Sequence, residues 1–222
     1  MPQSTDSHLS FWNVSFTNCG LRTFKAVFII LWLSLCLPAE CEGAKKVSAS
    51  MIKQWRKNYK TKVTFDPNTA YPWFIVSANK TYVESGDRRQ NVPDNPERFN
   101  NTPALLGHPG FTSGKLYWEV EYGDQREWAV GVALERVDRK VYLRLSPEEG
   151  IWQKGLWWLR ALENRSHALP VRPGIIGIFL NYKAGTVAFY IQGKLILKRA
   201  SFNREKVFPF FYLGGGVHLK LI

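Results

Sequence analysis

Residues 114–131, GKLYWEVEYGDQREWAVG, constrain the fold more than any other stretch of the chain. Over 116–122 every second residue is large and apolar, which is the two-residue period of a β-strand with one buried face. Gly123-Asp124 has the chemistry of a turn, and the alternation resumes over 128–132. We therefore expect a central hairpin with one core tryptophan on each strand, each contributing about 1.5–3 kcal/mol on burial.

From residue 63 onward the chain is a series of short apolar runs separated by turns. Nine Trp, nine Tyr, fourteen Phe, twelve Pro and seventeen Gly also favour a β-rich fold with many turns. Further strands are expected at 63–65, 74–76, 81–83, 104–106, 141–145, 151–159, 176–180, 187–191, 195–197, 208–212 and 217–221. About a dozen antiparallel strands at this spacing predict an all-β fold, a two-sheet antiparallel β-sandwich.

The first 43 residues have the pattern of a secretory signal peptide with a long n-region. An apolar run at 26–37 follows Arg22 and Lys25 and precedes small residues. As a helix this run rises only about 18 Å, short of the ~30 Å hydrocarbon core of a bilayer. Cleavage after Ala39 or Gly43 is expected, and the protein is then secreted without stable membrane insertion. Two alternatives remain for the apolar run. One is a buried core helix, and the other is an uncleaved signal anchor, which would also place the domain outside the cell.

Residues 44–62 form a basic N-terminal segment without Gly or Pro. Met51, Ile52, Trp55 and Tyr59 recur in it at helical spacing, which predicts a short amphipathic helix. Such a helix can bind membranes. Packing of Trp55 against its own domain is the preferred interpretation.

Cysteine usage and charge narrow the class of function. Cys19, Cys36 and Cys41 all precede the domain, which therefore has no thiolate metal site, catalytic cysteine or internal disulfide. The formal net charge of +12 suits anionic partners, among them an anionic glycan. Nothing in the sequence indicates a specific nucleic acid.

A series of motifs resembles those of PRY–SPRY domains. These motifs are 63–70 (VTFDPNTA), 92–99 (VPDNPERF), 110–115 (GFTSGK), 118–121 (WEVE) and 179–185 (FLNYKAG). The resemblance covers 63–222 and implies the same β-sandwich fold. In the last motif the family usually has acidic residues where Asn181 and Lys183 stand, which changes the local charge.

Within that group, 125–131, 142–149 and 151–160 closely resemble the vespryns, the ohanin-like proteins of reptile venoms. The chain lacks the immunoglobulin domains of butyrophilins and the RING cysteines of tripartite-motif proteins. The resemblance implies a secreted protein classed with toxins, whose relatives are associated with reduced locomotion and heightened pain. A non-venom paralogue of the same ancestry would carry the same motifs.

No catalytic constellation is expected in the domain. His108, His167 and His218 are not accompanied by a Gly-x-Ser-x-Gly elbow, and each is interpreted as a surface or structural histidine. Glu119 and Glu121 share a strand face, as paired carboxylates would. They are more simply solvent-facing or salt-bridged residues, so we expect no enzyme activity, cofactor or metal.

The candidate partner site is an aromatic and basic patch on loops, made of Arg126, Lys154, Trp157 and Arg160. Tryptophan and arginine dominate interface hot spots, and SPRY domains, by resemblance, bind partners through loops at one end of the sandwich. The alternative is that Trp152, Trp157 and Trp158 all belong to the core.

Three sequons in the domain, at Asn79, Asn100 and Asn164, are candidates for N-glycosylation. Asn164 lies in a polar loop and is the best of them. Pro103 follows the second sequon and makes Asn100 the weakest.

The sequence thus favours a secreted, non-enzymatic and neuroactive protein-binding module of vespryn type, expected to be a monomer. Its expected partner is an extracellular or neuronal protein. One alternative is an intracellular SPRY adaptor of the butyrophilin or tripartite-motif kind. Another is a basic secreted protein that binds glycosaminoglycan.

Overall fold

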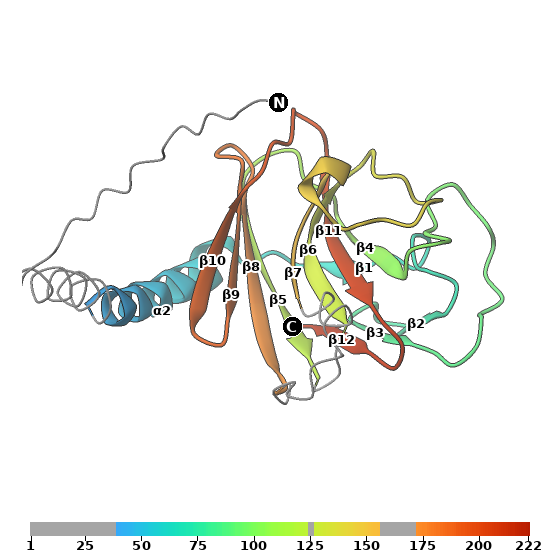
Figure 1. Ribbon diagram of the computed structural model, residues 1–222, viewed down its shortest axis with the longest axis horizontal. Coiled ribbons are helices and arrows are strands. Elements are labelled where there is room, and N and C mark those ends of the chain that lie inside the picture. The colour runs from blue at the N-terminus through green and yellow to red at the C-terminus, as the bar shows by residue number, and fades with distance from the viewer. Residues whose placement is uncertain (1–38, 124–126, 156–171) are drawn as a thin grey trace, which may run out of the picture. The chain divides into compact units, whose positions relative to one another are not determined.

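The computed structural model describes residues 39–123, 127–155 and 172–222 (Figure 1). The fold described below lies within the compact unit Ala44–Ile222. Among the described residues a single α-helix, α2 (Ala39–Tyr59), precedes the strands, and a 3-10 helix, η1 (Pro147–Glu149), lies between β6 and β7. No helix in the described residues combines the length and the apolarity needed to cross a membrane.

Twelve strands in the described residues form two antiparallel sheets. They are β1 (Thr64–Phe65), β2 (Phe74–Val76), β3 (Tyr82–Ser85), β4 (Ala104–His108), β5 (Lys115–Tyr122), β6 (Trp128–Leu134), β7 (Ile151–Gly155), β8 (Gly174–Asn181), β9 (Thr186–Ile191), β10 (Lys194–Arg199), β11 (Val207–Leu213) and β12 (His218–Leu221). One sheet has the order β1-β4-β11-β6-β7 and the other β10-β9-β8-β5-β12-β3-β2. The prediction of an all-β, two-sheet antiparallel sandwich is confirmed.

The predicted central hairpin is wrong, because β5 and β6 belong to different sheets. The chain crosses from one layer of the sandwich to the other between them. Tyr122 at the end of β5 stacks on Trp128 at the start of β6, with 4.3 Å between ring centroids. Two strands that face each other across a core have the same alternation as two paired strands, so the pattern alone did not distinguish the arrangements.

The predicted burial of the two tryptophans is confirmed. Trp118 and Trp128 are each only 1% exposed. Trp118 also stacks on Phe111, with ring centroids 6.3 Å apart. Both indoles therefore lie in the apolar layer between the sheets.

The predicted strand at 141–145 is absent, although its alternation is real. Leu143 and Leu145 are buried while Tyr142 is 71% exposed. The segment is held by the Thr102 hydroxyl, which donates to the carbonyl of Val141 and accepts from the N–H of Leu143, both at 2.9 Å. The buried side chain of Thr102 thus makes the backbone hydrogen bonds that a neighbouring strand would make, and no strand forms here.

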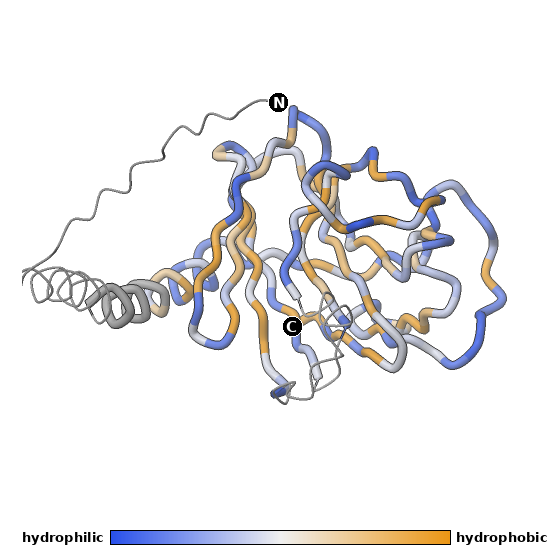
Figure 2. Tube along the Cα trace, viewed as in Figure 1, coloured by the Kyte–Doolittle hydropathy of each residue, from blue (hydrophilic) through white to orange (hydrophobic). Residues whose placement is uncertain are grey.

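The strands at the C-terminal side agree with prediction. β8 pairs with β9, and β9 pairs with β10 in continuous antiparallel register. The two residues between β9 and β10, Gln192 and Gly193, have φ of 48° and 76°. Positive φ at both positions is the type I′ turn that suits a two-residue hairpin. Figure 2 shows the resulting pattern, with apolar residues along the strands and polar residues in the turns.

Candidate functional site

The predicted basic helix is present as α2, and its packing follows the preferred interpretation. Trp55 is 6% exposed and stacks on Phe179 of β8, with ring centroids 4.2 Å apart and planes 4° apart. Ile52, Trp55, Tyr117, Phe179 and Ala188 form a second apolar cluster, separate from the core between the sheets. Helix α2 therefore covers part of the outer face of the seven-stranded sheet.

An ionic cluster around the buried carboxylate of Glu119 joins this helix to β5. Oε1 of Glu119 accepts from Arg56 Nε at 2.7 Å and from the Tyr117 hydroxyl at 2.6 Å, and Arg56 Nη2 is 2.6 Å from the same oxygen. Burial, and then the bond to Glu119, raise the pKa of Tyr117. The bond to Glu119 raises the pKa of Arg56.

Glu119 and Glu121 share a face of β5 but differ in burial and bonding. Glu119 is 6% exposed and engaged by two donors, whereas Glu121 is exposed and its Oε2 lies 3.4 Å from Lys220 Nζ. Of the two simple alternatives for these residues, the internally salt-bridged one holds for Glu119. The sequence carried one signal for the cluster, since Tyr117 and Glu119 share a strand face and a basic helix precedes them.

Of the four predicted partner-site residues, only Lys154 lies among the described residues. Arg126, Trp157 and Arg160 lie outside them. Lys154 is half-buried within β7, opposite Val130 of β6, so its expected position on a loop is wrong. Trp152 of the same strand is core, with its ring at 83° to that of Phe202 and centroids 5.3 Å apart.

The other three residues adjoin strand ends in the sequence: Arg126 shortly precedes β6, and Trp157 and Arg160 follow β7. Ala129 near the start of β6 is opposite Gly155 at the end of β7. The chain therefore enters β6 and leaves β7 at the same end of the five-stranded sheet. Glycine is required at position 155, because a Cβ there would lie 1.9 Å from the carbonyl oxygen of Trp128.

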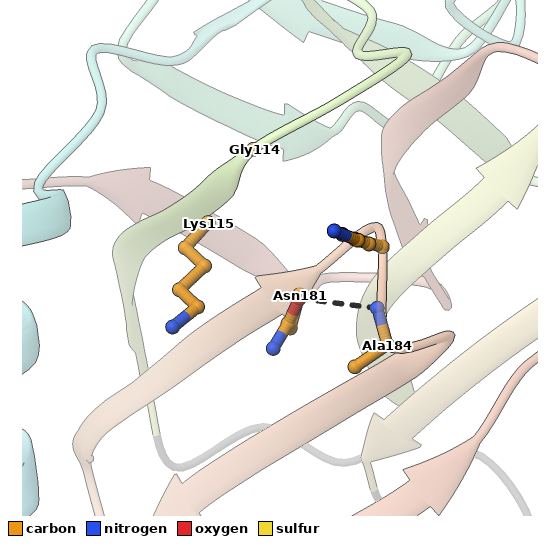
Figure 3. Close-up of a pocket in the computed structure, with 5 residues that line it drawn as sticks. Gly114, Lys115, Asn181 and Ala184 are labelled. Atoms are coloured by element: carbon orange, nitrogen blue, oxygen red, sulfur yellow. Dashed lines mark hydrogen bonds between the residues drawn. The ribbon is translucent and has the colours of Figure 1, made fainter.

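A basic pocket of about 540 Å³ lies at the junction of β5 with the β8–β9 turn (Figure 3). Its lining includes Lys115, Asn181 and Lys183, and none of the described residues that line it is acidic. Asn181 is neutral, and its Oδ1 accepts from the N–H of Ala184 at 3.2 Å. The charge of the lining therefore comes from Lys115 and Lys183. The pocket is therefore suited to an anion, at the positions where the family usually has acidic residues.

A second hollow, of about 330 Å³, is polar and acidic on balance. Asp66, Glu97 and Glu135 line it together with Arg139. Burial lowers the pKa of Arg139, whose Nη1 donates to the carbonyls of Glu135 at 3.0 Å and Val137 at 2.9 Å. Arg139 thus stabilises the loop in which it lies. This residue was not identified from the sequence.

The two described sequons differ in accessibility. Asn79 is exposed, and its Oδ1 accepts from the hydroxyls of Ser77 at 2.7 Å and Thr81 at 2.9 Å. Asn100 donates to Asp94 at 3.0 Å, and Thr102 of the same sequon is fully buried. Asn164 lies outside the described residues. The geometry thus favours Asn79 over Asn100.

Two histidines lie among the described residues, and they differ in burial. His108 ends β4 and is exposed. His218 on β12 is half-buried, with its ring stacked 5.8 Å from that of Tyr82. His167 lies outside the described residues.

Comparison with known proteins shows which protein families and which individual proteins this chain is similar to. The profile of the SPRY-associated domain (PRY) matches residues 63–111, and that of the SPRY domain matches 115–222. Ohanin from Ophiophagus hannah is 50% identical over 190 residues, which are 86% of this chain and 98% of ohanin. Vespryn from Crotalus adamanteus is 49% identical over 195 residues, which are 88% of this chain and 86% of that protein.

A solved structure shares the fold. The crystal structure of the TRIM65 PSpry domain superimposes with a TM-score of 0.58 at 20% identity, covering 78% of this chain and 94% of that one. The fold and both domain profiles agree, and the sequence is half identical to ohanin over most of its length. The chain therefore belongs to the PRY–SPRY proteins and, within them, to the vespryn (ohanin-like) family.

Proposed function

We propose that the chain is a secreted, non-enzymatic binding module of the vespryn type that acts on an extracellular, neuronal protein. The observation that carries this proposal is the extent of the likeness to ohanin, which covers 86% of this chain. That share exceeds what the residues from 63 to 222 can supply. The likeness to ohanin therefore extends into the residues that precede 63.

We place the partner surface at the end of the five-stranded sheet where β6 begins and β7 ends. In sequence, Arg126 shortly precedes β6, and Trp157 and Arg160 follow the end of β7, the strand that contains Lys154. Aromatic and guanidinium groups together are typical of interface hot spots, whose truncation costs about thirtyfold or more in affinity.

Secretion is tested by expression in animal cells. We expect the protein in the medium to begin after Ala39 or Gly43. Product retained in the cytosol, or beginning at Met1, would favour the intracellular adaptor.

The partner surface is tested with Trp157→Ala and Arg160→Ala in capture from neuronal membranes, alongside thermal melting. Trp73→Ala is the matched control, because Trp73 is 38% exposed beside β2 in the other sheet. We expect both variants to fold and lose capture while the control keeps it. Normal capture by both variants would place the surface elsewhere, and unfolding of Trp157→Ala would assign that indole to the core.

An anionic glycan is a second candidate ligand, favoured by the pocket that holds Lys115 and Lys183. Its test is retention on heparin at increasing salt, which screens such contacts. Lys115→Glu with Lys183→Glu should elute at lower salt than the parent and lower than an equal charge change at Lys57 and Lys62. Equal elution of the two double variants would show that only net charge matters.

A further inference from the structure

Strand β10 (Lys194–Arg199) is an open edge of the seven-stranded sheet (Figure 1). Among the described residues it pairs with β9 alone, over all six of its positions. An edge strand presents a row of N–H and C=O groups that can pair with another extended chain. The continuous register, without a bulge or proline, keeps this row straight.

The turn between β9 and β10 identifies which backbone groups point outward. In a two-residue hairpin the residues that flank the turn form a hydrogen-bonded pair, and such pairs recur at every second position. Lys194, Ile196 and Lys198 therefore bond to β9. The N–H and C=O groups of Leu195, Leu197 and Arg199 point away from the sheet.

The side chains of β10 divide between two faces. Leu195 and Leu197 lie on the outer face, opposite Tyr190 and Ala188 of β9, and are 38% and 63% exposed. Ile196 points to the core between the sheets, so Lys194 and Lys198 lie on that side.

The inner side of this edge is rich in positive charge. Burial and the nearby ammonium of Lys154 lower the pKa of Lys198. Three of the six residues of β10 are cationic, and none is acidic; the three are Lys194, Lys198 and Arg199. An approaching strand with carboxylates on one face would therefore relieve repulsion that this edge now carries.

We propose that the β10 edge binds an extended acidic peptide segment by strand addition. The outward backbone groups of Leu195 and Leu197 pair with the peptide main chain. Alternate carboxylates face Lys194 and Lys198, and apolar residues between them cover the two leucines. This proposal rests on the backbone and the charges of β10 itself, so it stands if the loop site proposed above fails.

A second copy of this chain does not fit the same edge. Antiparallel pairing of β10 with itself, centred on Ile196, would set Lys194 directly against Lys198 of the other copy. Like charges directly opposite each other destabilise a strand pair. The charge pattern thus selects an acidic partner over self-association.

The test uses the full chain and a labelled, capped peptide, Glu-Val-Glu-Val-Glu-Val-Glu, with its Lys-Val counterpart as the control probe. We expect the acidic peptide alone to bind, with affinity that falls as salt rises. On binding, the amides of Leu195 and Leu197 should exchange with deuterium more slowly, while those of Ile196 and Lys198 change little.

Two pairs of variants separate the backbone from the charge. Leu197→Pro removes an outward donor without touching the β9 ladder and should weaken binding about tenfold, more than Leu197→Thr, which keeps the donor. Leu195→Pro serves the same purpose should the first variant misfold. Lys194→Glu with Lys198→Glu should abolish binding, whereas Lys57→Glu with Lys62→Glu should not.

Three results would overturn the proposal. The first is peptide binding unchanged by both proline variants. The second is equal loss in the two charge-reversed double variants, which would show a net-charge effect. The third is retention on phosphatidylserine vesicles together with no peptide binding, which would make the edge a membrane contact.

Discussion

The two faces of the seven-stranded sheet are covered to different extents and in different ways. Its inner face lies against the other sheet and is apolar, with Trp118 and Ile178 at 1% and 0% exposure. Its outer face is covered only where α2 crosses it, and there an aromatic stack is combined with the Arg56–Glu119–Tyr117 cluster. Beyond the helix, Ile175 on the same face is 43% exposed. The inner face thus depends on the whole sandwich, whereas the outer face depends on one helix.

The largest effect is expected on the inner face. Trp118→Ala should lower the free energy of unfolding by about 3–5 kcal/mol, because a fully buried indole leaves a large cavity between the sheets. Thermal or denaturant melting measures it. An unchanged melting temperature would contradict the position of β5 at the centre of the core.

A smaller and more local effect is expected from the outer face. Trp55→Ala should cost about 1.5–3 kcal/mol through lost burial, chiefly as undocking of α2. Amide exchange should then quicken along α2 while β8 and β11 stay protected. Simultaneous loss of protection in helix and strands would mean that the helix is integral to the sandwich.

Substitution of the two carboxylates of β5 compares a buried with an exposed ionic contact within one strand. Glu119→Gln replaces a buried acceptor of charged hydrogen bonds and should cost about 1 kcal/mol or more. Glu121→Gln removes an exposed ion pair with Lys220 and should cost less than about 0.5 kcal/mol. Chemical denaturation of both variants checks the difference, and equal losses would contradict the buried cluster.

The smallest effect concerns alkaline pH. The folded-state pKa of Tyr117 is raised above its unfolded value, so the folded protein holds that proton more tightly. Its contribution to stability is complete below about pH 10 and is lost as pH rises toward the folded-state pKa. Tyr117→Phe should therefore lose less stability than the parent above pH 10. Tyr82 and Tyr122, whose pKa values are also raised, remain in both proteins, so an identical pH slope would contradict the assignment.

Local patterning was enough to locate most elements of the fold. The β8–β9 and β9–β10 hairpins, the burial of Trp118 and the helix around Trp55 follow from signals within about ten residues. Short turns, two-residue alternation and helical spacing act over those distances, so they can be identified from sequence alone. For the same reason the sequons at Asn79 and Asn100 were found, although not their difference in exposure.

Tertiary structure alone decided what each element lies against. Alternation shows that one face of a strand is buried but not which strand or layer covers it, so β5 and β6 were assigned to one hairpin. The same limit applied to 141–145, where Thr102 replaced a neighbouring strand, and to Lys154, which lies in β7. The bonding of Glu119 to Arg56 and the open edge at Leu197 depend on segments distant in sequence, because non-local packing, not local pattern, fixes such contacts.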